Sequence, residues 1–503
     1  MRADWRAHVA GVCRWLLLLL LAGHLLFRQA FAHRGLGDLF SSGETGAFGH
    51  AYVTEVVLAF LLPYAVILTW RRRHTQYELP ASEARQRRAW GAPVYLALAF
   101  LGWGIAHAVI AVFTGGDVYL IFRQSALAGY SIFFLYTFIF LGDQARHVRQ
   151  AVLVALVVAL LCAALDAGAS LAGPVQQAQH PSLAFLAEKP YGQETLPIAI
   201  LGLSLAIVCF EDWWWRALAL LALALAGWRQ GARFQSVIPI SLAGALALYL
   251  VLGAALALRG QVNTLRRAVV LLVLFGLLAF GYHRWHNDAG EPAEVKAWSW
   301  DNYGRLFDVY GRTTAPQDPK DFVFSTRAAV PVGDPEVYKL KAVSDACADL
   351  SVRNNIWRFL VWRRMALDWA AGRTFVGAGV GKPWFYGALY HTSFHYGEDR
   401  LGLDPHNSYL NLLYRYGAVG FLILVALLLS VLYYLWKALL IQPGIGDVLL
   451  ECIVLYFFYT VVFVCFTVGL EGPSYSMPFW MALGLGYARA RQLLYARDDA
   501  LTV

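Results

Sequence analysis

The sequence has 503 residues, of which 59% are hydrophobic and 15% are charged. A soluble protein carries about 25% charged residues, so this composition excludes a soluble globular enzyme and predicts a membrane protein. The formal net charge of +8 does not indicate nucleic-acid binding, because arginines in short loops between apolar segments report membrane topology.

Apolar segments that approach or exceed the roughly 18 residues needed to cross a bilayer recur along the chain. The first contains the run RWLLLLLLAGHLLF, which lacks a clear signal-peptide cleavage site, so we expect it to stay as a helix. The expected fold is an all-α polytopic membrane protein with about 12 transmembrane helices. They are predicted at 12–31, 50–70, 92–113, 119–141, 151–172, 194–210, 214–228, 235–258, 268–283, 407–436, 448–470 and 475–490.

Charge predicts how these helices are oriented. The polar segment 71–88 contains six arginines, which predicts that it lies in the cytoplasm. If the N-terminus lies on the same side, most Lys and Arg of the short loops are cytoplasmic. We therefore expect both termini to be cytoplasmic.

One long polar stretch, residues 284–405, separates the helices into two groups and lies on the outer side by this topology. Loops longer than about 15 residues are usually functional or disordered, and the Trp and Tyr content here argues against disorder. Within it, VRNNIWRFLVWRRMALDW (352–369) reads as an amphipathic helix, which could simply lie on the bilayer surface. The expected regions are transmembrane helices 1–9 in 1–283, the periplasmic loop 284–405, helices 10–12 in 406–490 and a cytoplasmic tail, 491–503.

The stretch GLDPHNSYLNLLYRYGAVGF (402–421) places a histidine directly before an apolar run. Asn407 is a good N-cap, and Pro405 keeps Asp404 out of the helix, so His406 should lie just outside a helix N-terminus at the outer boundary. The positive end of the helix dipole disfavours imidazolium and attracts phosphate. A lone loop histidine is usually a solvated bystander, but this position makes His406 a candidate catalytic base.

Four arginines are expected near the outer side, namely Arg123, Arg229, Arg233 and Arg353. An arginine at membrane depth costs a few kcal/mol or more, so it usually faces a cavity or an anion. The alternative for each one singly is that it extends to the lipid headgroups. Together they suit a pyrophosphate, because guanidinium pairs bidentately with phosphate.

Two other features are expected to lie outside the site. Arg415 follows His406 by nine residues, about half a turn out of phase, so it should pair within the helix bundle. GAGVGKP (377–383) lacks the preceding glycine and the final Ser/Thr of a phosphate-binding loop, since Val376 and Pro383 stand there. We interpret it as a glycine turn.

Metal chemistry is not expected. The sequence has no CxxC pair and no carboxylate cluster at an outer helix end, so we predict no metal and no cofactor. Glu398, Asp399 or Asp404 could orient His406, and the sequence does not distinguish among them.

The segments RNNIW (353–357), GAGVG (377–381) and HNSYLNLLYRYGAVG (406–420) resemble the O-antigen ligase and polymerase (Wzy/WaaL-like) membrane proteins of bacteria. The similar region covers about 215–425, with an arginine-bearing outer turn at 229–233. The resemblance implies metal-independent glycosyl transfer at the periplasmic face of the bacterial inner membrane. The donor would be an undecaprenyl-pyrophosphate-linked glycan, and the product lipopolysaccharide or exopolysaccharide.

The same resemblance implies roles for individual residues. His406 would act as base on the acceptor hydroxyl, supported by Asn407 and Asp404. The pyrophosphate would be held by Arg123 and Arg353 together with Arg229 or Arg233. Which of the last two is the counterpart remains open, because the turn lacks the Ser-Arg-Gly sequence usual in the family. Arg415 stands where the family commonly has an acidic residue.

Rival interpretations remain. A ligase and a polymerase share the donor and differ in the acceptor, which is lipid A-core, another lipid-linked repeat or, in related enzymes, a protein serine. A transporter of lipid-linked glycan would show broken helices and related halves, and we see neither in the sequence. A non-catalytic scaffold for polysaccharide assembly is a third class.

Overall fold

The computed structural model describes six main stretches of the chain, which are 4–26, 53–75, 90–142, 237–288, 406–441 and 448–501 apart from position 468. It also describes the segment 375–381 and isolated positions at 147–154, 213–217, 304–312 and 358–372. The regular structure in this part of the chain is helical, and none of its residues lies in a strand.

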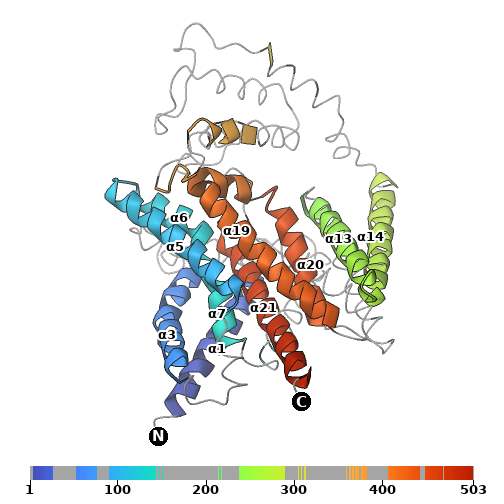
Figure 1. The fold of residues 1–503 in the computed structure, drawn as a ribbon. Helices are drawn as coiled ribbons and strands as arrows, with labels where there is room; N and C mark the ends of the chain where they lie inside the picture. The colour runs from blue at the N-terminus through green and yellow to red at the C-terminus, as the bar shows by residue number, and fades with distance from the viewer. Residues whose placement is uncertain are drawn as a thin grey trace, which may run out of the picture.

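The helices of the described stretches form a bundle, drawn in Figure 1 with the labels used here. They are α1 (Asp4–Leu26), α3 (Val53–Thr75), α5 (Ala92–Phe113), α6 (Val118–Gly129), α7 (Ile132–Phe140), α13 (Val237–Ala257), α14 (Val262–Asp288), α19 (Ser408–Ile441), α20 (Val448–Phe463) and α21 (Pro473–Leu501). In Figure 1, α1 begins and α21 ends at one end of the bundle, whereas α19 begins toward the opposite end, beside the segment 375–381.

Three of these helices are long and apolar enough to cross a membrane, namely α5, residues Ile240–Ala257 of α13, and α19. Large apolar side chains on them are exposed, among them Ile105, Val109, Val251, Leu422 and Leu429. Helices that expose such side chains over this length fit a lipid environment better than water. They indicate a membrane protein, in agreement with the composition.

The predicted spans agree with the helices in part. α5 coincides with the predicted span 92–113. The span predicted at 119–141 consists of two helices, because α6 and α7 are separated by a tight turn. In that turn, the Ser131 backbone N–H and hydroxyl both donate to the carbonyl of Ala128. The spans predicted at 151–172, 194–210 and 214–228 lie outside the described residues except for positions 154 and 217, so the total of twelve stays a prediction.

The centre of the bundle is closely packed around α21, which contacts α7, α19 and α20. Trp480 of α21 is fully buried, and its ring centroid lies 6.3 Å from that of Phe100 of α5. Gly484 brings α21 so close to α7 that a Cβ there would lie 2.6 Å from the carbonyl oxygen of Phe134. Small residues allow such approaches between membrane helices.

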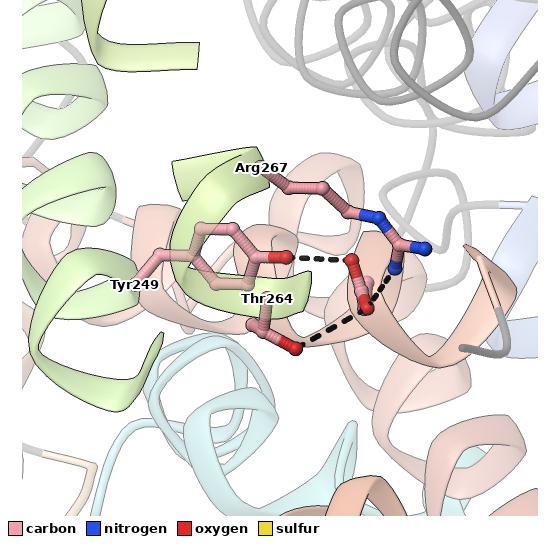
Figure 2. A network of polar contacts seen from close by, with 4 residues as sticks. Tyr249, Thr264 and Arg267 are labelled. Atoms are coloured by element: carbon pink, nitrogen blue, oxygen red, sulfur yellow. Dashed lines mark hydrogen bonds and ion pairs between the residues drawn. The ribbon is translucent and has the colours of Figure 1, made fainter. Parts of the chain in front are cut away.

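The hairpin of α13 and α14 packs mainly against α20. A buried polar network joins the three helices, as Figure 2 shows from close by. The carboxylate of Glu451 on α20 forms an ion pair with Arg267 of α14 and accepts hydrogen bonds from the hydroxyls of Tyr249 (2.7 Å) and Thr264 (3.5 Å). Buried charges are tolerated when they are paired and hydrogen-bonded in this way.

Replacing Glu451 with alanine is expected to lower the thermal stability of the protein in detergent strongly, because Arg267 would remain buried without this carboxylate. Loss of one partner of a buried ion pair typically costs about 3–5 kcal/mol. The matched control is Asp308→Ala, which breaks the ion pair of Asp308 with Arg312. The Asp308 side chain is 52% exposed and the Arg312 side chain 82% exposed, and exposed ion pairs contribute little to stability. A thermal unfolding scan of the two variants checks this. Equal melting temperatures for both would contradict the explanation.

Candidate functional site

His406 lies at the start of α19 with an unusual backbone conformation. Its φ is +53°, the only positive φ at a non-glycine position among the described residues. Such left-handed conformations are uncommon outside glycine and concentrate at functional sites. The Asn407 side chain accepts a hydrogen bond from the backbone N–H of Leu410 at 2.9 Å, so the predicted N-cap and the predicted helix start at Ser408 are confirmed.

The first turn of α19 is bound to the loop that joins α20 to α21. The backbone N–H of Ser408 donates to the carbonyl of Val464 at 3.0 Å. The Ser408 hydroxyl accepts from the backbone N–H groups of Gly469 and Leu470, and it donates to the buried carboxylate of Glu471. This connection holds the backbone two residues beyond His406 in a fixed place.

The carboxylate of Glu471 continues into a polar chain along the inner face of α19. It accepts a hydrogen bond from the Asn411 side-chain amide at 3.0 Å. The Asn411 side-chain oxygen in turn accepts from Nε of Arg415 at 2.9 Å, and Arg415 is only 2% exposed. The prediction that Arg415 pairs within the bundle is confirmed.

α19 is interrupted at Gly417, where φ is +67° and ψ is −172°. The span predicted at 407–436 therefore consists of two helices joined at a kink, and the absence of broken helices inferred from the sequence is wrong at this position. The interruption frees backbone carbonyls that would otherwise bond within the helix. Buried polar groups need partners, and other segments supply them here.

The partners come from the glycine segment 375–381 and from α5. The backbone N–H groups of Ala378 and Gly379 donate to the carbonyls of Tyr414 (2.7 Å) and Arg415 (2.9 Å). The indole of Trp103 on α5 donates to the carbonyl of Tyr416 at 3.0 Å. The predicted glycine turn therefore has a specific structural role, because its backbone completes the hydrogen bonding of the interrupted helix.

The same glycine segment reaches α6. The backbone N–H of Gly381 donates to the side-chain oxygen of Gln124 at 2.8 Å, and its carbonyl accepts from the backbone N–H of Asp117 at 3.0 Å. The Tyr416 hydroxyl donates to the carbonyl of Gln124 at 3.1 Å. The helix that carries Arg123 is thus held against the interrupted part of α19.

Arg123 itself pairs with a carboxylate. Its guanidinium lies 3.3 Å from Glu55 of α3, and the Tyr130 hydroxyl donates to the same oxygen at 2.9 Å. An anionic ligand at Arg123 would have to compete with Glu55 for the guanidinium.

Arg358 lies beside His406. Its guanidinium Nη2 is 3.4 Å from Nδ1 of the imidazole. Arg358 belongs to the predicted amphipathic segment, and the described positions between 358 and 370 are helical. That helix contacts the bundle through Trp362, whose ring centroid lies 6.5 Å from that of Phe466, and its Met365 is only 1% exposed. Phe466 lies in the loop between α20 and α21, which also contains Glu471.

The candidate site therefore differs in part from the residues predicted. His406 and Asn407 lie at a helix N-terminus as expected, and Arg123 is in the ion pair described above. The remaining predicted site residues lie outside the described residues; they are Arg229, Arg233, Arg353 and Asp404, together with the possible orienting residues Glu398 and Asp399. Sequence reasoning missed Arg358 and Glu471. Each had a weak signal in the sequence: Arg358 lies in the amphipathic segment 352–369, and Glu471 is an acidic residue between two apolar segments.

Chemically, this arrangement combines an imidazole, a guanidinium and a helix N-terminus. The guanidinium and the helix end both favour an anion, and a neutral imidazole can accept a proton. Within the described part of the chain, no group of three or more His, Cys, Asp or Glu side chains could hold a metal ion.

No protein-family model matches the chain, and no curated protein gives a significant match to it.

Proposed function

We propose that the chain is a membrane glycosyltransferase of the O-antigen ligase-like type. It transfers a glycan from an undecaprenyl-pyrophosphate-linked donor to an acceptor hydroxyl at the periplasmic face, in lipopolysaccharide or exopolysaccharide assembly. The observation that carries the proposal is the approach of Arg358 to His406 at the start of α19. These two groups are a proton acceptor and a cation, which this transfer needs when no metal takes part.

In the proposed reaction, the acceptor oxygen attacks the anomeric carbon of the donor sugar as the bond from that carbon to the pyrophosphate breaks. His406 takes the proton of the hydroxyl, and the pyrophosphate leaves as an anion. Arg358 stabilises that anion, and we retain Arg123, Arg353 and Arg229 or Arg233 as further candidates. Preorganised cations are effective where charge develops on a leaving group.

The proposal is tested with purified protein in proteoliposomes that contain the lipid-linked donor and an acceptor. We expect glycan transfer to continue in EDTA, since arginines rather than a metal ion stabilise the leaving group. Transfer that requires added Mg²⁺ would contradict the proposed site. Offering lipid A-core and a second lipid-linked repeat in parallel separates a ligase from a polymerase.

A transporter of lipid-linked glycan is the second candidate function, and the interruption of α19 at Gly417 favours it. Transporters commonly bind their substrates where helices are broken. The interruption here, however, is filled by backbone of the segment 375–381, which leaves fewer free backbone groups for a substrate. The enzyme proposal also uses His406, for which a transporter has no evident need.

A further inference from the structure

The contact between Arg358 and His406 has a defined direction. A guanidinium stays protonated in proteins and has no acceptor atom, so it can only donate a hydrogen bond. In the contact at 3.4 Å, Nδ1 of His406 must therefore be the acceptor. An imidazolium would place two donors against each other, so the arrangement selects the neutral ring.

This direction also determines which ring nitrogen carries the proton. A neutral imidazole has one N–H and one lone pair. When Nδ1 accepts from Arg358, the proton is on Nε2, and the lone pair at Nδ1 is already occupied. In this state His406 has no free lone pair for an acceptor hydroxyl.

We propose that Arg358 masks the lone pair of His406 until an anionic diphosphate draws the guanidinium away. This inference rests on the proposed function and gives Arg358 a second role, control of the lone pair of His406, besides stabilisation of the leaving pyrophosphate. A guanidinium forms charge-assisted, bidentate hydrogen bonds with phosphate, which are stronger than a single bond to a neutral acceptor. Binding of the donor would then expose the base, so that the acceptor is deprotonated only when a donor is present.

The backbones that carry Arg358 and His406 are held by separate contacts, so the guanidinium can leave the imidazole without moving either helix. His406 precedes a capped helix whose first turn is bound to the loop between α20 and α21. Arg358 comes from a separate helix, which contacts the bundle through Trp362. The guanidinium can therefore move along its flexible side chain while both backbones stay in place.

The test measures how fast His406 reacts with diethyl pyrocarbonate, which acylates a ring nitrogen with a free lone pair. The full-length protein in detergent is treated briefly, and modification of the His406 peptide is followed by mass spectrometry. We expect Arg358→Ala to react about tenfold faster than the wild type, the effect of losing one hydrogen bond from a charged group. The control is Arg363→Ala, which removes an exposed arginine of the same segment and should react at the wild-type rate.

A second arm uses the wild-type protein and inorganic pyrophosphate, so it does not depend on the folding of a variant. Pyrophosphate should raise the wild-type rate toward that of Arg358→Ala and leave the rate of the variant unchanged. Equal rates for wild type and Arg358→Ala would overturn the masking, and a wild-type rate that pyrophosphate does not raise would overturn the unmasking. Neither result depends on glycan transfer, whereas the proposed function fails only if transfer itself fails.

Discussion

Replacing His406 with alanine is expected to reduce the rate of glycan transfer by about 10²–10⁴-fold, the usual contribution of a positioned general base. The physical reason is that the acceptor hydroxyl would have to lose its proton to water rather than to an imidazole. The rate is measured with saturating donor, so that weaker binding does not contribute. Binding of the donor should change little, because the proposed ligands of the pyrophosphate are arginines.

A matched control for this variant is His147→Ala. His147 bonds Arg14 of α1 at 2.7 Å and is distant in the sequence from the start of α19. Its loss should leave the transfer rate near the wild-type value. If His406→Ala inserts normally and still transfers glycan at the wild-type rate, His406 is not the base.

Replacing Gly417 with alanine is expected to cause the second large effect. A Cβ at this position would overlap the carbonyl oxygen of Phe375, and a φ of +67° is strained for any residue with a side chain. The segment 375–381 would have to move away, which would leave the carbonyls of Tyr414 and Arg415 without the donors described above. We expect a large loss of thermal stability and of transfer activity together.

Gly102→Ala provides the comparison for that variant. Gly102 lies in α5, and a Cβ built there meets no atom within 4 Å. Alanine is favoured over glycine in a helix interior by roughly 1 kcal/mol, so this variant should be as stable as the wild type or more so. A Gly417→Ala protein with wild-type stability would show that the interruption of α19 is not required.

Local rules predict the start of α19 well. Asn407 is a preferred N-cap residue before an apolar run, and the cap and the helix start are both present. The phase of Arg415 relative to His406 correctly indicated that its side chain pairs within the bundle. These features depend on residues within one or two helical turns, so the sequence contains enough information to predict them.

Other features depend on segments that are distant in the sequence. Gly417 follows a helical pattern, and its positive φ is stabilised by backbone groups of residues 375–379, in another segment of the chain. The contact of Arg358 with His406 likewise depends on how the helix around Trp362 rests on the loop after α20. Periodicity and propensity do not contain this information, because tertiary packing determines it.

A glycosyltransferase breaks the bond from the donor sugar to the pyrophosphate and makes a glycosidic bond to the acceptor, whereas a transporter moves the lipid-linked glycan intact. The most direct measurement follows a donor labelled in both the glycan and the lipid, with purified protein, an acceptor and EDTA in sealed vesicles. The proposed glycosyl transfer predicts free undecaprenyl pyrophosphate and glycosylated acceptor in equal amounts, with both products lost in His406→Ala. A donor that crosses the vesicle membrane with both labels still joined, equally in wild type and in His406→Ala, would contradict it.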